Sequence, residues 1–180
     1  MAKLITFNGR TPRIDPTAFV APGAVLIGDV EIGPEASIWY NCVLRGDVNR
    51  IRIGARTNIQ DGSVLHVDSP RPGHESGFAT IVGEEVLIGH LAMVHGCILR
   101  DRAFVGLGSI VMDGCEIESD AMLAAGAMLT PGKRIPSGQL WAGRPAKYVR
   151  DLSQADIEGM RAGVAHYVML ARLHAAALSA

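Results

Sequence analysis

The chain has 180 residues, a size that suits one domain with its own core. Hydrophobic residues make up 48% of it, which excludes a disordered chain. The 17 basic and 18 acidic residues leave a net charge of −1, which excludes an electrostatic partner such as nucleic acid or an anionic membrane. Aromatic residues are only 5%, so the core must be built from aliphatic side chains.

The beginning of the chain and its cysteines indicate where the protein works. Residues 1–7 are too short and too polar for a signal peptide, and no run of apolar residues is long enough for a membrane span. The three cysteines, Cys42, Cys97 and Cys115, form no CxxC motif. An odd number of cysteines without an export signal is typical of a reducing compartment. We therefore expect a cytoplasmic protein.

From Val20 onward an aliphatic residue recurs at every sixth position, in four runs. These are Val20, Leu26, Ile32, Ile38 and Leu44; Ile53, Ile59 and Leu65; Val82, Ile88 and Val94; and Leu99, Val105, Val111, Ile117, Leu123, Leu129, Ile135 and Trp141. The fifth place of most repeats is small or β-branched, and Val48 would occupy one such place. A short strand followed by a tight turn explains this period, whereas a helix or a simple strand does not. About three repeats would close one coil, with the aliphatic residue pointing inward and the coils stacked about 4.8 Å apart.

Two interruptions of the repeat are informative. Residues 49–52 add three positions between Leu44 and Ile53. The segment near 68–80 contains no repeat but has two prolines and two glycines, which predicts a loop ejected from the coil. We expect the coil to extend over residues 1–150 with this loop inserted.

The pattern changes over residues 151–180, which we assign to the same domain. The segment Ser153–Asp156 resembles a capping box. Apolar residues then follow at helical spacing, namely Ile157, Met160, Val164, Val168 and Ala171. A helix of about five to seven turns is expected, packed along a flat side of the coil. His166 and His174 are predicted to be surface residues of this helix.

Three of the six histidines occupy informative places. His66 and His95 both follow the inward aliphatic residue, so both should point outward. They are 29 residues apart, which equals one coil of 18 residues plus about 11 in the ejected loop, so they should stack on consecutive coils. His90 lies in the third place of the preceding repeat and should belong to another side of the prism. A neighbouring subunit could present it, and a closed three-fold ring would then hold three equal sites.

Three histidines with one open position are typical of a catalytic zinc, which lowers the pKa of its bound water to about 7. A lone outward histidine in such a repeat is usually only a surface residue. Two in matching places with a third nearby favour a metal site. Cys97, two residues after His95, is either a soft ligand or a packing residue.

Five segments carry a resemblance to a known family. They are Asn41–Asp47, Asn58–His66, Ile88–His90, Val94–Cys97 and Leu140–Ala146. With these segments the chain resembles the γ-class carbonic anhydrase-like family of hexapeptide-repeat proteins, from about Ala18 to the final helix. The spacing does not reveal the hand of the coil. The resemblance implies an all-β fold, a left-handed parallel β-helix of hexapeptide repeats with a C-terminal α-helix packed along it.

The resemblance also implies a homotrimer in which His66 and His95 of one subunit and His90 of the next hold Zn²⁺, a place that Fe²⁺ or Co²⁺ could also take. The implied reaction is that of a lyase, the reversible hydration of carbon dioxide, a small-molecule substrate, to bicarbonate by metal-bound hydroxide. Further site residues are implied: Arg45, Asp47 and Asp61 in the interface network, Gln60 as the group that orients the bound water, Asn58 beside it, and Tyr167 near the metal.

One departure from the family pattern concerns proton transfer. The most active relatives carry a glutamate after the Arg-Gly-Asp stretch, whereas this chain continues with residues 48–50, which contain no carboxylate. The remaining candidates for a proton relay are His74, Glu75 and Tyr167, and His74 has the most suitable ordinary pKa. Two other functions therefore stay open. One is a CoA-thioester hydrolase or acyltransferase of the hexapeptide-repeat group, and the other is a non-catalytic metal-binding trimer.

Overall fold

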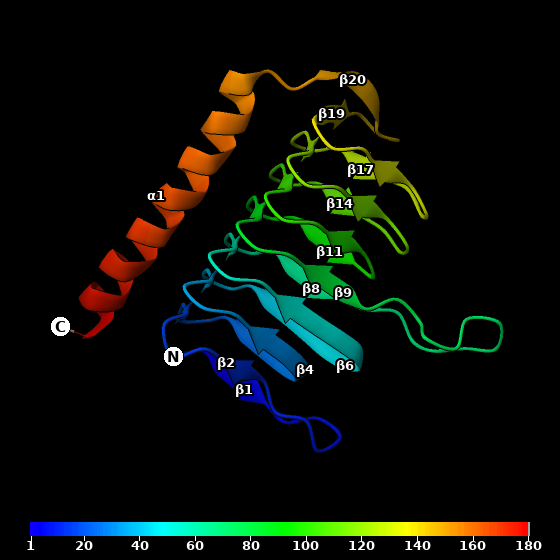
Figure 1. The fold of residues 1–180 in the computed structure, drawn as a ribbon. Coiled ribbons are helices and arrows are strands. Elements are labelled where there is room, and N and C mark those ends of the chain that lie inside the picture. The colour runs from blue at the N-terminus through cyan, green and yellow to red at the C-terminus, as the bar shows by residue number, and fades with distance from the viewer. Residues whose placement is uncertain (180) are drawn as a thin grey trace.

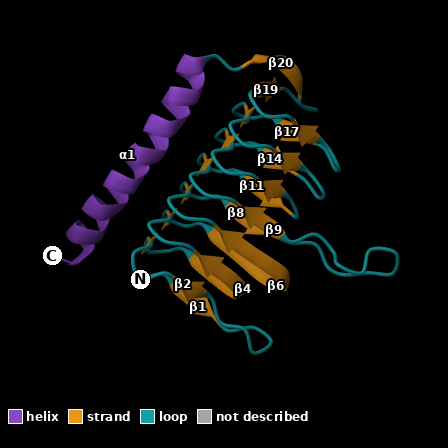
Figure 2. Ribbon diagram, viewed as in Figure 1, coloured by secondary structure: helices purple, strands orange, loops and turns teal. Residues whose placement is uncertain are grey.

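Short parallel strands stacked one above another form a three-sided β-helix, and one long helix lies beside it (Figure 1). This computed structural model describes residues 1–179. Turns occupy the corners between the strands, and two loops project away from the coil (Figure 2). The predicted fold class, a left-handed parallel β-helix with a C-terminal helix packed along it, is confirmed.

The first side of the prism is called the apolar face. Its strands are β1 (Lys3–Ile5), the first half of β4 (Val25–Ile32), the first half of β6 (Val43–Ile53), β8 (Val64–His66), β11 (Met93–His95), β14 (Ile110–Val111) and β17 (Met128–Leu129). The outward residues of this face stack in register and, after Lys3 in the first coil, are apolar: Val25, Val43, Val64, Met93, Ile110 and Met128. No segment of residues 1–179 covers this column, and Met93 is 39% exposed.

The second side is called the charged face. Its strands are β2 (Arg13–Ile14), the second halves of β4 and β6, β9 (Thr80–Val82), β12 (Ile98–Leu99), β15 (Glu116–Ile117) and β18 (Arg134–Ile135). Its outward column consists of Glu31, Arg52, Ile81, Ile98, Glu116 and Arg134. Ion pairs link charges along this face, for example Arg100 with Glu116 at 2.6 Å and Arg52 with Glu31 at 3.3 Å.

The third side is called the helix face. Its strands are β3 (Phe19–Val20), β5 (Ser37–Ile38), β7 (Asn58–Ile59), β10 (Leu87–Ile88), β13 (Phe104–Val105), β16 (Met122–Leu123), β19 (Gln139–Ala142) and β20 (Lys147–Asp151). β20 is antiparallel to β19 and ends the stack. The helix α1 (Gln154–Ser179) covers β3, β5, β7 and β10 of this face.

The interior of the coil is filled by the residues that the period of six places inward. Leu44, Leu65, Val94, Val111 and Leu129 are completely buried in successive coils. Glycines that follow inward residues allow the coils to approach, since a Cβ on Gly54 would lie 2.4 Å from the carbonyl carbon of Gly83.

The prediction that Val48 occupies the fifth place of a repeat is wrong, because this residue is 43% exposed. The three extra residues lie within 47–50, because Gly28 pairs with Gly46 and Val30 pairs with Ile51, and they do not form a turn. They lengthen β6 to 11 residues, so the strand continues across a corner beside β4.

The helix α1 begins as the capping box predicts. The hydroxyl of Ser153 accepts a hydrogen bond from the backbone N–H of Asp156 at 3.2 Å, and the Asp156 carboxylate accepts one from the N–H of Ser153 at 2.8 Å. Its buried residues are Met160, Val164, Val168 and Ala171. The prediction that His174 is a surface residue is wrong, because its ring packs against Trp39 and lies 2.8 Å from the Tyr40 hydroxyl. Within residues 1–179, no helix is long and apolar enough to cross a membrane.

The ejected loop lies between β8 and β9 and projects from the stack (Figure 1). Asn49 of β6 holds its base, because its amide donates to the carbonyls of Asp68 at 3.1 Å and Ser76 at 2.8 Å. At the end of the loop, the Thr80 hydroxyl donates to the His66 carbonyl and accepts from the Gly96 N–H. The loop therefore leaves and rejoins the coil beside two of the candidate histidines.

Candidate metal centre

His66 and His95 stand side by side at the end of the apolar face. The register of β8 and β11 pairs them directly, and their ring centroids are 4.9 Å apart. Nδ1 of His66 and Nε2 of His95 face each other at 2.9 Å. The two residues are called the histidine pair. Stacking of the coils, with the ejected loop absorbing the surplus residues, brings them together as the repeat implies.

A carboxylate lies behind each ring of the histidine pair. Nε2 of His66 is 3.0 Å from Oδ1 of Asp47, and Nδ1 of His95 is 2.5 Å from Oδ1 of Asp113. An ionised carboxylate only accepts hydrogen bonds, so the nitrogen facing it carries the proton. The two nitrogens that face each other therefore both present lone pairs.

Burial lowers the pKa of His66, and the nearby Arg45 guanidinium and His95 lower it further, although the Asp47 carboxylate opposes the shift. Asp47 is itself held ionised. Burial would raise its pKa, but hydrogen bonds from His66 and Arg45 outweigh burial and lower it. The neutral imidazole that a metal ligand requires is thus the favoured form of His66.

His90 belongs to a second group of residues, at the corner between the helix face and the apolar face. Its Nδ1 lies 2.9 Å from a carboxylate oxygen of Asp61, and its Nε2 is 3.4 Å from the Tyr167 hydroxyl. Gln60 and Asn58 lie on the neighbouring coil, and Gln60 donates from Nε2 to Oδ1 of Asn58 at 3.0 Å. These five residues are called the His90 cluster.

The sequence-predicted site residues thus form two groups in one chain. Arg45 and Asp47 lie with the histidine pair and bond each other. Gln60, Asn58 and Tyr167 lie instead with His90, which precedes β11 whereas His95 ends it. Within residues 1–179 no three histidine, cysteine or acidic side chains are arranged to hold one metal ion. The two groups could form a complete ligand set only if different chains contributed them.

Two other residues considered from the sequence lie outside these groups. Cys97 is buried inside the coil, where burial raises the pKa of its thiol, so it is a packing residue. His74 lies in the ejected loop with its ring 4.0 Å from that of Phe78, and its Nδ1 is buried without a hydrogen-bond partner among the described residues. The rings pack together, so His74 does not extend freely into solvent.

Asp113 was not among the residues that the sequence suggested. It lies 18 residues after His95, and this spacing of one coil is the signal that could have identified it. A search for acidic residues 18 or 19 positions away from each histidine would have found both Asp113 and Asp47, which precedes His66 by 19 residues.

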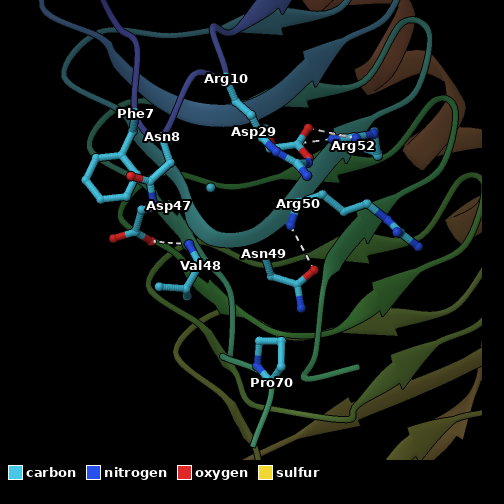
Figure 3. Close-up of a pocket in the computed structure, with 11 residues that line it drawn as sticks. Phe7, Asn8, Arg10, Asp29, Asp47, Val48, Asn49, Arg50, Arg52 and Pro70 are labelled. Carbon is cyan, nitrogen blue, oxygen red and sulfur yellow. Dashed lines mark hydrogen bonds and ion pairs between the residues drawn. The ribbon is translucent and has the colours of Figure 1, made fainter. Parts of the chain in front are cut away.

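A cleft lies beside the histidine pair rather than on it. It has a volume of about 540 Å³ and opens between the N-terminal loop and β6, with Asp47 on its wall (Figure 3). None of the three histidines lines it. Arg10 and Arg52 point into the cleft, but both are paired with Asp29. We assign no ligand to it.

The donor set fits a divalent metal. Two lone pairs that face each other at 2.9 Å repel unless a cation lies between them. Tetrahedral zinc with Zn–N bonds of 2.0–2.1 Å places two ligand nitrogens about 3.3 Å apart, so a small ring movement would admit it. Imidazoles whose second nitrogen donates to a carboxylate are the usual form of metal-bound histidine. All three histidines have this form.

Comparisons with known proteins agree with this geometry. No family model matches the chain. It is 45% identical over 172 residues to gamma carbonic anhydrase 2, mitochondrial, of Arabidopsis thaliana, and covers 62% of that protein. It therefore spans less than two thirds of this relative. It is also 42% identical to a carbonic anhydrase of Geobacillus kaustophilus, with 86% of this chain and 81% of that protein covered.

Among solved structures, a hexapeptide transferase family protein from Anaplasma phagocytophilum is similar throughout. The TM-score is 0.88 with 47% identity, and the match covers 94% of this chain and 96% of that chain. The stacked coils, the three histidines backed by carboxylates and these relatives lead to one assignment: the chain belongs to the γ-carbonic anhydrase family of hexapeptide-repeat proteins.

Proposed function

We propose that the protein is a homotrimeric, zinc-dependent carbonic anhydrase in which each metal site is shared between two subunits. One observation carries the proposal: three histidines, each backed by its own carboxylate, are divided between two separate groups of one chain. The histidine pair supplies two ligands and the His90 cluster of a second copy supplies the third. The carbonic anhydrase relatives support the reaction.

The surface chemistry of the coil supports the assembly. The helix face is covered by α1 and the charged face carries ion pairs along its outward column, whereas the outward column of the apolar face from Val25 to Met128 has neither. Leu91, next to His90, is 73% exposed and adopts a φ of 57°, which is unusual for a leucine. Exposed apolar surface of this kind marks a protein contact. A closed ring would bury it and would repeat the same contact three times.

The chemistry needs a nucleophile at neutral pH, and a metal held by three imidazoles supplies it by lowering the pKa of bound water. In the His90 cluster, Gln60 uses its Nε2 on Asn58, which leaves its Oε1 as an acceptor that can orient a water molecule. Nδ2 of Asn58 is buried without a partner among the described residues, so it is a donor that remains unused beside Gln60.

A small apolar substrate has room beside the histidine pair. A hollow of about 300 Å³ opens there, lined by Met93, Ile110 and Met112 together with His95 and Asp113. Carbon dioxide is small and carries no net charge, so it can enter such a hollow without losing strong hydration. The product bicarbonate is an anion, and the methionine side chains offer it no stabilisation, which favours its release.

Proton transfer sets the expected rate. Burial and the nearby Asp61 carboxylate raise the pKa of Tyr167, so its phenol stays protonated at neutral pH and is a poor proton acceptor. His74 packs against Phe78 in the ejected loop. We therefore expect hydration to be slow in weak buffer and to increase when imidazole is added, because buffer must carry the proton away.

The decisive experiment measures metal and activity on the same preparations. Wild-type protein should hold about one divalent metal per chain, and His66→Ala and His90→Ala should each hold almost none. An equal mixture of the two variants, unfolded and refolded together, should recover about one quarter of the sites, because one interface in four then joins an intact pair to an intact His90. No recovery despite mixed trimers would contradict the shared site. Full metal occupancy without hydration would contradict the carbonic anhydrase reaction.

Acyl transfer or thioester hydrolysis is the second candidate function. It is favoured by the likeness to the hexapeptide transferase family protein, which extends over almost the whole of both chains. Such a reaction needs one basic histidine in a cleft but no shared metal. Turnover of acetyl-CoA that survives metal chelation would support it over hydration.

A further inference from the structure

We propose that Asp113 is a positioning residue for His95, and that it sets the affinity of the shared site for its metal; this rests on the proposed function. Asp113 lies in the turn that follows β14, one coil away from His95. Its Oδ1 lies 2.5 Å from Nδ1 of His95.

The contact fixes which nitrogen of His95 is free. Because the Asp113 carboxylate accepts a hydrogen bond from Nδ1, the proton stays on that nitrogen and Nε2 keeps its lone pair. Nε2 is the atom that faces His66. Without Asp113, the proton of His95 could move to the other ring nitrogen, or the ring could rotate. His66 and His95 could then share a hydrogen bond across the 2.9 Å gap instead of binding a cation.

The surroundings of Asp113 are shaped to hold it in this place. A Cβ on Gly96 would lie 2.3 Å from Oδ1 of Asp113 and 2.8 Å from Cβ of Phe78, and Gly96 has a φ of 52°. Only glycine leaves room there for the carboxylate. Phe78, at the end of the ejected loop, also lies 3.1 Å from the Cβ position of Gly114, the residue after Asp113. The loop end thus packs behind the turn that carries Asp113.

The contact between Asp113 and His95 should contribute little to the stability of the fold. The side chains of His95 and Asp113 are 31% and 35% exposed, and an ion pair at that exposure stabilises a fold little. A carboxylate that orients a metal-bound histidine matters far more for the metal, typically about 10- to 100-fold in affinity. The two roles therefore predict different results for the same substitution.

The chain offers a matched control in Asp101. This residue also lies in a turn of the coil, and a Cβ on Gly83 would lie 2.3 Å from its Oδ1, just as for Gly96 and Asp113. Its Oδ1 accepts a hydrogen bond from the backbone N–H of Glu84 at 2.9 Å, and no histidine is involved. Asp101→Asn therefore removes a similar carboxylate with no link to the histidine pair.

The test measures the Kd for Zn²⁺ by competition with a chromophoric chelator, the visible spectrum of the Co²⁺-loaded protein, and the Tm of the metal-free protein. Asp113→Ala should weaken binding by about 10- to 100-fold and shift the Co²⁺ bands. Asp113→Asn should fall between it and the wild type, because the amide oxygen still accepts the hydrogen bond with less charge. Asp101→Asn should bind as the wild type does.

Two results would overturn the role of Asp113. One is Zn²⁺ affinity of Asp113→Ala within about twofold of the wild type, when His66→Ala no longer binds. The other is a loss of affinity equal to that of Asp101→Asn. If Asp113→Ala fails to fold, the isosteric Asp113→Asn decides by the same criteria. Failure of the metal site itself is distinguishable, because His66→Ala and His90→Ala would then bind Zn²⁺ as well as the wild type does.

Discussion

The apolar face and the charged face are built alike, from short parallel strands stacked in register, yet their outward columns present opposite chemistry. β4 and β6 run through both faces, with Val25 and Val43 outward on one and Glu31 and Arg52 outward on the other. Inside the coil the two faces do not differ, since both contribute aliphatic residues. The inward positions therefore hold the coil together, and the outward positions decide what each face does. The face whose outward column is apolar from Val25 to Met128 is the one that ends in the histidine pair.

The largest effect, on assembly and metal content, is expected from a charge placed in the outward column of the apolar face. Met93→Glu would place a carboxylate in the middle of the apolar face, where a second copy would have to bury it. We expect a monomer by light scattering and metal content that falls from about one per chain to almost none. Ile81→Glu on the charged face is the control, because the new carboxylate lies beside Arg52. A Met93→Glu trimer with full metal would show that the apolar face is not the interface.

The second prediction concerns the interior, where the two faces should behave alike. Leu65 lies inside the apolar face and Leu99 inside the charged face, and both are buried. Replacing either by alanine should lower the free energy of unfolding by about 2–5 kcal/mol, through lost burial and the cavity left behind. Denaturant unfolding with a chelator present removes the contribution of bound metal. A loss confined to Leu65→Ala would mean that the interior also distinguishes the two faces.

A smaller effect is expected at Asp29, where charge is buried next to the charged face. Burial alone would raise the pKa of Asp29, but hydrogen bonds and charges from Arg52 and Arg10 outweigh it, so the folded pKa lies below the ordinary value. A lowered pKa gives stability that is present above the unfolded pKa of about 3.9 and is lost as the pH falls through the folded pKa.

Asp29→Asn should therefore lower the free energy of unfolding at pH 7 by roughly 1.5–3 kcal/mol. The difference from the wild type should shrink as the pH falls below about 4. Unfolding curves recorded from pH 7 down to the acid limit test this. A difference that stays constant across the range would show that the ion pairs with Arg52 and Arg10 do not stabilise the fold.

The smallest effect is expected on the exposed part of the charged face. Arg134 pairs with Glu118 and, at 3.8 Å, with Glu116, and its side chain is 64% exposed. Arg134→Ala should change the free energy of unfolding by less than about 1 kcal/mol, because solvent screens such pairs. Assembly and metal content should not change. A large loss of stability here would show that the ion pairs act as a network.

Much of the fold follows from the period of six, because the interior of a narrow coil admits only one kind of residue at each place. The stacking of His66 and His95 follows from the same period once the ejected loop is subtracted. The path of β6 could not be predicted from the period, since the extra residues could have formed a turn. Pairing with β4 on both sides of the insertion keeps them in the strand instead. The position of His174 could not be predicted either, because its burial depends on Trp39 and Tyr40, which are far away in the sequence.

The candidate site could be predicted only in part, for a similar reason. Backbone register places the three histidines, and the register is visible in the sequence. Asp113 reaches His95 through its side chain across coils, and the contact depends on the absence of a side chain at Gly96. The repeat shows that Asp113 lies about one coil after His95, but it does not show that the two side chains meet. Gln60 and His66 lie on different sides of the prism, although they are close in the sequence. Their separation depends on the conformation of the turn between β7 and β8.

The ejected loop separates the two strands that carry the histidine pair, yet the spacing of the pair comes from the pairing of β8 with β11. Lengthening a flexible loop costs little, about 0.6 kcal/mol for each doubling of its length. Insertions between Ser69 and Glu75, away from the segment that Phe78 and Thr80 anchor, should therefore leave both imidazoles where they are. This makes the loop tip a place where the chain can acquire new segments over evolution, or accept a peptide tag in the laboratory, without disturbing the centre beside it.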